Sequence, residues 1–316
     1  MSRLHCTKMN GTRRSAVTLL ELVVVLGLLA LLAGVAVQSL DPIANQSRYE
    51  TSQNLLDAVR SATIGAPDRN KANGQKMIYG YVADSGDLPS SLNDLIQKPA
   101  AIVAYATESF DSDRDLVNDV SLARGWNGPY FQLGAGRSNI LDGWGNALTI
   151  QNTSGVLTVA SLGSDNDSIA PENGYQADIT VIMPVNSYAG DIAFRLYAID
   201  STSGTRVDPT LSNLEAGNPS PPAGTKLLGI HFYAKNASGG TTGTVQEQMC
   251  PVAMTGSFEY RVSGAIHGKA AARAVFWVDT NNDGLLNSGE VVWRKSCVHF
   301  FDIVSGQDNR IDMELR

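Results

Sequence analysis

The hydrophobic and polar positions of this 316-residue chain predict a long helix at its start and many strands toward its end. No charged or strongly polar side chain occurs from Leu22 to Val37, and Val17 to Val37 gives 21 residues, close to the ~20 that a helix needs to cross a bilayer. We therefore expect a helix over residues 17–64, of which residues 17–37 form a transmembrane segment.

The second half of this helix has a different pattern. After Gln38, apolar residues at Leu55, Leu56, Val59 and Ala62 recur at helical spacing with polar residues between them. This pattern is typical of an amphipathic helix that packs one face on a body.

Residues 180–316 contain short runs rich in β-branched and aromatic residues, divided by Gly, Pro, Asn and Ser. The runs are ITVIMPV, DIAFRLYAID, KLLGIHFYA, GSFEYRVSGA, AARAVFWVD, EVVWRKSCVHFFDIV and NRIDMELR. Runs of this length with frequent turn signals indicate an all-β sandwich of the immunoglobulin or transthyretin kind.

Charge adds a direction to the first segment. The formal net charge is −7, but four positive groups and no acid precede Val17; without them 20 Lys and Arg stand against 31 Asp and Glu. So acidic a body repels phosphates, and we expect no nucleic acid partner. The positive-inside rule keeps residues 1–16 in the cytoplasm and sends the body outward. We expect a single-pass inner-membrane protein with its C-terminal body in the periplasm.

Glu21 needs an explanation, because a carboxylate at the front of an apolar run is costly. The same layout is compatible with a secretory signal peptide cut near Ala33 to Ala36, a twin-arginine signal or a plain signal anchor. None of these alternatives gives Glu21 a role.

The stretch TRRSAVTLLELVVVLGLLALLAGVAV resembles the N-terminus of type IV pilins and type II secretion pseudopilins. The resemblance implies a basic leader, residues 1–16, that a prepilin peptidase removes between Ala16 and Val17, where the family usually has Gly and Phe. It also implies methylation of the new amine of Val17, and an assembly role for Glu21, which pairs with the amine of an adjacent subunit.

GWNGPYF, ILDGWGNALTI and GVLTVASLGSDND, in this order, are similar to elements of the major pseudopilin of type II secretion. The resemblance implies that residues 65–179 form a small antiparallel sheet domain. It also implies a calcium site in the following loop, with ligands from Leu162, Asp165, Asp167 and Asp178. The alternative is a solvated acidic loop without metal.

A second candidate calcium loop is DTNNDGLLNSGE, residues 279–290, which fits the spacing D-x-[DN]-x-[DN]-G-x5-E at every fixed position. Strand-like flanks make it similar to calcium loops between strands of bacterial surface modules. The expected oxygen ligands are Asp279, Asn281, Asp283, Leu285 through its carbonyl, Asn287 and Glu290. The alternative is an Asn/Asp/Gly turn that binds nothing.

Cys250 and Cys297 remain once a leader containing Cys6 is removed. A disulfide between them would close a loop of about 48 residues and contribute roughly 4 kcal/mol in the chain-entropy estimate; the alternative is two buried free thiols. His231, His267 and His299 fall in no catalytic motif, so we do not expect an enzyme.

Together these patterns predict an α+β fold: a long pilin-like helix with a membrane half and an amphipathic half, a small pseudopilin sheet domain and a C-terminal β-sandwich. The expected function is a structural subunit of a type II secretion pseudopilus or a related type IV pilus-like filament, stabilised by one or two structural Ca²⁺ ions. Expected partners are other pilin-like subunits, the prepilin peptidase, the inner-membrane assembly platform and the membrane. The alternatives are a minor tip pilin or adhesin whose sandwich binds a partner or cargo, and an anchored calcium-dependent hydrolase.

Overall fold

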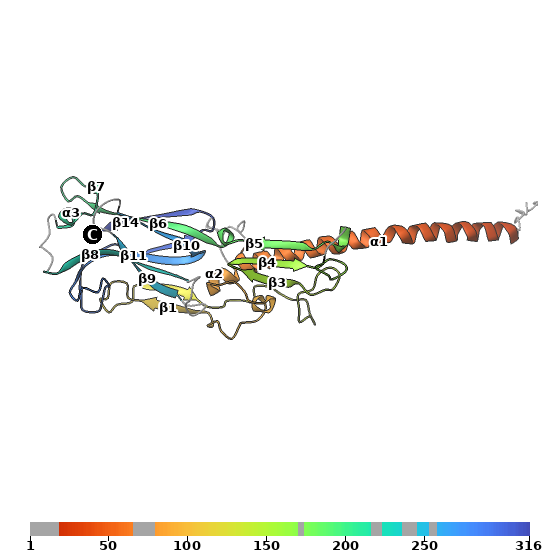
Figure 1. The fold of residues 1–316 in the computed structure, drawn as a ribbon, viewed down its shortest axis with the longest axis horizontal. Coiled ribbons are helices and arrows are strands. Elements are labelled where there is room, and N and C mark those ends of the chain that lie inside the picture. The colour runs from red at the N-terminus through yellow and green to blue at the C-terminus, as the bar shows by residue number, and fades with distance from the viewer. Residues whose placement is uncertain (1–18, 66–79, 170–173, 216–222, 236–244, 253–257) are drawn as a thin grey trace, which may run out of the picture.

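The computed structural model describes residues 19–65, 80–169, 174–215, 223–235, 245–252 and 258–316. They form an elongated molecule in which one long helix, α1, projects from a body of β-sheets, and the C-terminus lies at the opposite end (Figure 1).

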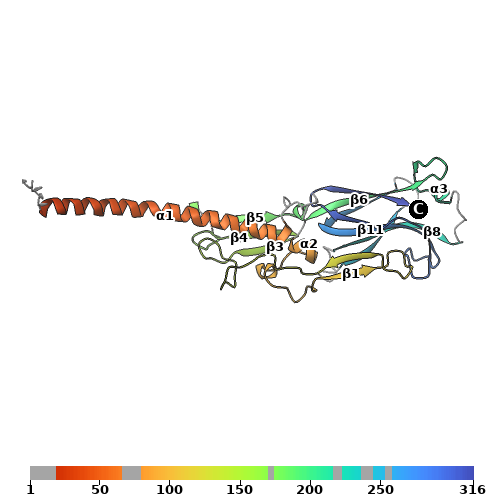
Figure 2. The ribbon, with the colours of Figure 1, turned by 180° about the vertical axis from the view of Figure 1, so that it is seen from behind.

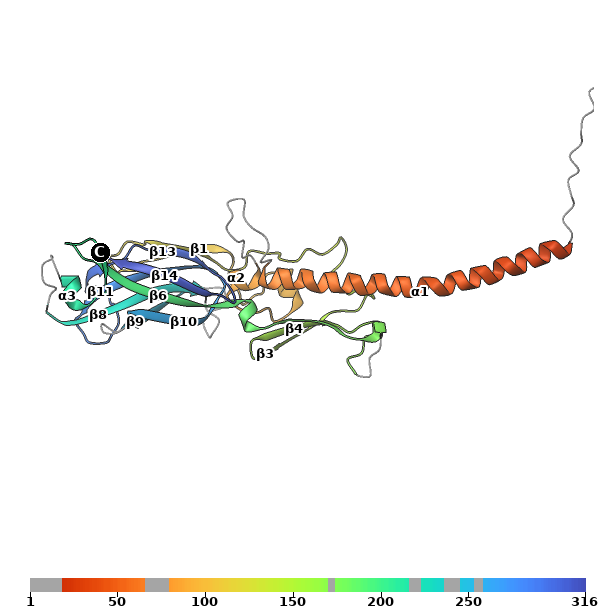
Figure 3. The same cartoon turned by 90° about the horizontal axis from the view of Figure 1, so that it is seen from above.

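Helix α1 spans Leu19–Ile64. Its first part is rich in Leu, Val and Ala, and its last turns bury Leu56 and Val59 against the body. Pro42, which lacks a backbone N–H donor, lies within the helix, and α1 bends along its length (Figure 3). The structure thus joins an exposed apolar segment and a docked amphipathic segment in one continuous element.

The docked part of α1 packs on a three-stranded antiparallel sheet of order β3-β4-β5, formed by β3 (Thr149–Thr153), β4 (Val156–Ser161) and β5 (Ile179–Met183). The short helices α2 (Tyr81–Ser85), η1 (Leu92–Leu95) and η2 (Gly174–Gln176) complete this first body. Its core includes Leu56, Val59, Leu95, Leu157 and Met183. Because β5 pairs with β4, the first body extends beyond residue 179, where we expected it to end.

A hairpin of β1 (Ala106–Phe110) and β2 (Val120–Arg124) leaves the first body and lies beside the β-sandwich (Figure 2). Val120 and Leu122 of this hairpin form a small core with Tyr233 and Ala271 of the sandwich. The segment that the sequence assigns to the pseudopilin-like domain is therefore shared between the two halves of the molecule.

The sandwich consists of two facing sheets. One has the order β10-β6-β14, with β7 paired to β6; the other has the order β12-β11-β8-β9, with β13 paired to β11. The strands are β6 (Ala189–Ile199), β7 (Arg206–Val207), β8 (Thr225–Lys235), β9 (Val245–Val252), β10 (Glu259–Ile266), β11 (Gly268–Asp279), β12 (Val291–Lys295), β13 (His299–Ile303) and β14 (Asp308–Leu315). The short helices η3 (Val185–Ser187) and α3 (Leu211–Glu215) lie in the connections.

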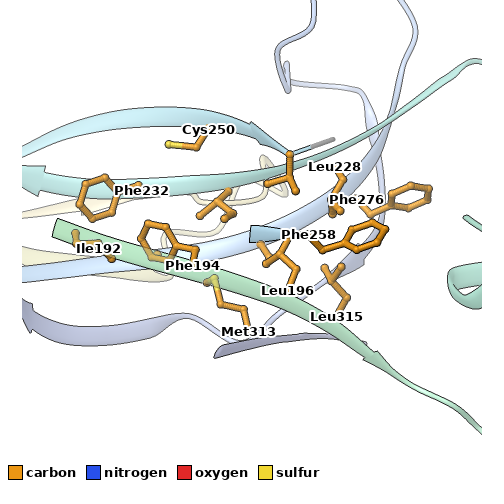
Figure 4. Close-up of a cluster of buried hydrophobic side chains, with 14 of the residues drawn as sticks. Ile192, Phe194, Leu196, Leu228, Phe232, Cys250, Phe258, Phe276, Met313 and Leu315 are labelled. Atoms are coloured by element: carbon orange, nitrogen blue, oxygen red, sulfur yellow. The ribbon is translucent and has the colours of Figure 1, made fainter. Parts of the chain in front are cut away.

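Side chains from both sheets meet in the core of the sandwich (Figure 4). Ile192, Phe194 and Leu196 alternate along β6 and face Phe232 and Phe276 of the other sheet. This period of two, with large apolar residues on one face, is what a half-buried strand requires.

The structure corrects the predicted fold class. Most of the regular structure is β-strand, in fourteen strands among the described residues, whereas the prediction gave an α+β fold. No helix in the part of the chain that the structure describes is long and apolar enough to span a membrane. This finding contradicts the predictions of a transmembrane segment over residues 17–37 and of a single-pass inner-membrane location.

Candidate functional site

The most unusual surface of the molecule is the first part of α1. Eleven large apolar side chains between Leu19 and Leu32 are at least 49% exposed. They include five consecutive positions, Leu22 to Leu26, and successive helical positions are turned by about 100°, so these five surround the helix. This segment has no polar face, and we call it the apolar helix segment, residues 19–34.

Two glycines lie in the apolar helix segment. A Cβ added at Gly27 or at Gly34 would meet no atom within 4 Å. The two positions are seven residues apart and therefore lie on the same side of the helix. Small residues on one side of a helix let a second helix approach the backbone closely.

The predicted processing and assembly residues fall at the start of this segment. Glu21 lies exposed in the first turn of α1. Ala16 and Val17 lie outside the described residues, as does the rest of the expected leader. The structure therefore does not test the expected cleavage.

The loop 279–290 connects β11 to β12, so strands flank it as the sequence predicts. The carboxylate of Asp279 accepts hydrogen bonds from the backbone N–H groups of Asn282, at 2.6 Å, and Gly284, at 2.9 Å. Glu290 closes the loop by accepting from the N–H groups of Thr280 and Asn287, both at 2.9 Å.

Asp283 lies in the middle of this loop and accepts hydrogen bonds from the backbone N–H of Leu285 and from the carboxamides of Asn287 and Asn281. These donors lower the pKa of the Asp283 carboxyl. The loop thus carries the oxygen types that Ca²⁺ prefers, but its own N–H groups occupy them. Among the described residues, its carboxylates are not gathered within the 4.8 Å that a shared metal ion would require.

The other predicted calcium loop follows β4. Asp165 accepts a long hydrogen bond of 3.4 Å from the N–H of Asp167, which accepts one of 3.1 Å from Ile169. Leu162 and Asp178 flank the loop in sequence, and residues 170–173 lie outside the described part of the chain. In the described residues, these carboxylates also form no cluster of metal-binding spacing.

The structure gathers three acids that sequence reasoning missed. Asp111, Asp113 and Asp115 bring carboxylate oxygens within 4.8 Å of one another, in the loop between β1 and β2. The alternation in DSDRD is the signal that would have indicated it.

Two cations of the sandwich neutralise this acidic loop. Arg273 lies 3.2 Å from the buried carboxylate of Asp113 and also pairs with Asp119, while Lys295 pairs with Asp113. Arg273 additionally donates to the carbonyl of Ser296 at 3.0 Å. We therefore interpret the cluster as the attachment of the β1–β2 hairpin to the sandwich.

A second buried polar cluster lies close by, around Glu247 of β9. Its Oε1 atom lies 2.6 Å from Nδ1 of His231, 2.7 Å from a guanidinium nitrogen of Arg114 and 3.1 Å from the hydroxyl of Tyr233. Burial by itself would raise the pKa of Glu247, but the hydrogen bonds from His231 and Arg114 outweigh it and lower this pKa to about 2. The carboxylate therefore stays charged and holds Arg114 of the hairpin loop against β8 and β9.

The predicted disulfide is not formed. Cys250 is buried in the sandwich core, whereas Cys297 is exposed between β12 and β13, and both thiols are free. The alternative of two buried free thiols therefore describes Cys250 but not Cys297. Burial raises the pKa of the Cys250 thiol to about 11.

The comparisons with known proteins do not assign the chain to a family. These comparisons give no support to the prediction of a pseudopilin that is processed from a prepilin for type II secretion. Its transmembrane segment is also contradicted, because no described helix is long and apolar enough to span a membrane. No protein-family model, no curated protein and no solved structure matches this chain.

Proposed function

We propose that this protein is a structural subunit of a pilin-like filament, in which the apolar helix segments of neighbouring copies pack against one another. The observation that carries the proposal is the exposure of eleven large apolar side chains on all sides of one projecting helix. The resemblance of TLLELVVVLGLLALLAGVAV to pilin N-termini supports the same proposal.

The free energy at stake is large. Covering a Leu or Val side chain completely contributes roughly 1.5–3 kcal/mol, so eleven of them represent on the order of 15–30 kcal/mol as an upper bound. A surface of this size needs a partner, because isolated apolar patches this extensive are rare on monomers.

Several copies of the same helix form the partner that best fits the geometry. A groove covers one face of a helix, whereas this segment is apolar all round and needs neighbours on every side. Gly27 and Gly34 give those neighbours a side of close approach. Head-to-tail contacts between such helices generate open filaments when the rotation from one copy to the next does not close into a ring.

A charge placed within the packed helices tests this. In Leu26→Asp a carboxylate replaces a side chain that is 56% exposed in the single subunit, and in an assembled bundle it would be buried without a partner. The matched control is Leu116→Asp, because Leu116 is 85% exposed but lies on the β1–β2 loop. Each protein is purified in detergent, the detergent is removed, and the product is followed by sedimentation and electron microscopy.

We expect ordered filaments from the wild type and from Leu116→Asp, and none from Leu26→Asp. Filaments of unchanged abundance from Leu26→Asp would overturn the role of the apolar helix segment. A wild type that stays monomeric, or that gives only amorphous aggregates, would overturn the filament itself.

Calcium belongs to the proposal as a structural ion in the loop 279–290, supported by the oxygen donors of the motif. In that case added Ca²⁺ stabilises the folded protein by about 2.7 kcal/mol when its concentration is 100-fold above the dissociation constant. Asp283→Asn should remove this increase in thermal stability. Equal melting temperatures with Ca²⁺ and with a chelator would exclude it.

A further inference from the structure

A buried lysine and a buried aspartate meet where the first body contacts the sandwich. Lys235 ends β8, and Asp84 belongs to α2. Their side chains are only 7% and 11% exposed, and Nζ of Lys235 lies 3.6 Å from Oδ1 of Asp84. The amine thus lies against the carboxyl group whose carbon, Cγ, it would attack.

The neighbouring groups orient both side chains. Nζ of Lys235 donates a hydrogen bond to the carbonyl oxygen of Ala83, which fixes the direction of the amine. The hydroxyl of Tyr130 donates to Oδ2 of Asp84 at 2.9 Å. The carboxyl group thus has one oxygen held by a donor and the other facing the amine.

Burial opposes the charge on both members of the pair. Desolvation lowers the pKa of Lys235 and raises the pKa of Asp84, and in each case the charge of the other member offsets only part of this effect. The neutral amine, which is the nucleophilic form, and the neutral carboxylic acid, which has a leaving group, are therefore favoured here more than at the surface.

Two further groups suit a reaction between them. Burial raises the pKa of Tyr130 well above its ordinary value, so its hydroxyl stays protonated and remains a donor. His267 is buried, and among the described residues its Nε2 atom has no hydrogen-bond partner. Burial and then the charge of Lys235 lower the pKa of His267 to about 4, which leaves a neutral base at neutral pH.

We propose that Lys235 and Asp84 condense to an intramolecular amide bond that links β8 to α2. The lone pair of Nζ attacks Cγ of Asp84, and a C–N bond forms. The oxygen held by Tyr130 takes the negative charge of the tetrahedral intermediate, a position in which a fixed donor is most effective. His267 transfers one proton from the nitrogen to the Oδ1 hydroxyl group. The C–Oδ1 bond then breaks, and the hydroxyl group leaves with this proton as one water molecule. No oxidant, reductant or further reactant is needed.

The proposal does not rest on the filament. It accounts for a lysine and an aspartate placed together in an apolar contact, where an ordinary ion pair contributes little because both charges lose their hydration. The bond would join the body that holds α1 to the sandwich by a connection that unfolding does not break.

Mass spectrometry of the purified full chain tests the bond directly. Trypsin does not cut after a lysine whose amine is acylated, so the digest should contain residues 77–114 joined to residues 227–261, lighter by the mass of one water than the two separate peptides. The same species should be absent from Lys235→Arg and retained in Lys269→Arg, the control at an exposed lysine.

Tyr130→Phe keeps the ring and loses the donor, and we expect a smaller cross-linked fraction at a given time after synthesis. A wild-type digest that holds only the linear peptides ending at Lys235 and at Arg114 would overturn the proposal. A joined peptide that persists in Lys235→Arg would assign the bond to another residue and overturn it equally.

Discussion

Replacing Glu247 by Gln removes the charge at the centre of the contact between the hairpin loop and the sandwich. The carboxylate of Glu247 is only 23% exposed and accepts hydrogen bonds from three groups on two segments, namely Arg114 of the hairpin loop and His231 and Tyr233 of β8. Gln keeps the size of the side chain and leaves the cationic Arg114 without its partner.

The pKa of Glu247 gives the magnitude and the sign. It falls from 4.5 to about 2 on folding, and this difference corresponds to about 3 kcal/mol of stability at neutral pH. Because the folded pKa lies below the unfolded one, this contribution is present above about pH 4.5. It is lost as the pH falls from there through about 2, when the folded carboxylate takes up its proton.

Urea unfolding, followed by tryptophan fluorescence in a non-ionic detergent that covers the apolar helix segment, measures the effect. The free energy of unfolding of Glu247→Gln should be lower than that of the wild type by about 3 kcal/mol at pH 7, and the difference should shrink toward zero near pH 2. The control is Glu259→Gln, which breaks an exposed pair with Arg261 and should change stability by less than about 1 kcal/mol. A Glu247→Gln difference that is the same at pH 7 and pH 2 would refute the electrostatic explanation.

Three further predictions concern packing and thiol chemistry. Gly143→Ala should lower the free energy of unfolding by about 1–3 kcal/mol, measured by thermal denaturation, because the added Cβ would lie 2.0 Å from the carbonyl oxygen of Arg48 and push the loop off α1. Phe194→Ala should cost about 3–5 kcal/mol in urea unfolding because it empties the centre of the sandwich core; a loss below 1 kcal/mol would contradict that packing. Iodoacetamide at pH 8 should label Cys297 rapidly and Cys250 only after unfolding, and equal labelling rates would contradict the burial of the Cys250 thiol.

Local patterns predicted much of the secondary structure. Helical spacing at Leu56 and Val59 indicated the docked part of α1, and alternation in DIAFRLYAID indicated β6, because each pattern reflects which side chains one element must bury. The motif DTNNDGLLNSGE placed a loop between two strands for the same local reason: its residues bond to their own backbone.

The contacts between distant segments were not predictable in this way. Asp84 and Lys235 are each ordinary in sequence, and only the docking of α2 on β8 brings them together. The same holds for Asp113, which the fold buries against Arg273. An apolar run predicts that a segment avoids water, but it does not show whether lipid or protein covers the segment. The prediction of a membrane span assumed that lipid covers it.

The parallel pairing of β6 with β14 has a mechanical consequence. β6 leads the chain into the sandwich from the first body and β14 ends it, with partners from Asp191 and Asp308 to Ala198 and Leu315. A pull between α1 and an object held at the far end of the sandwich would slide these strands along their length. The ladder hydrogen bonds would then bear the tension together in shear, whereas in a hairpin pulled open at one end they break one after another.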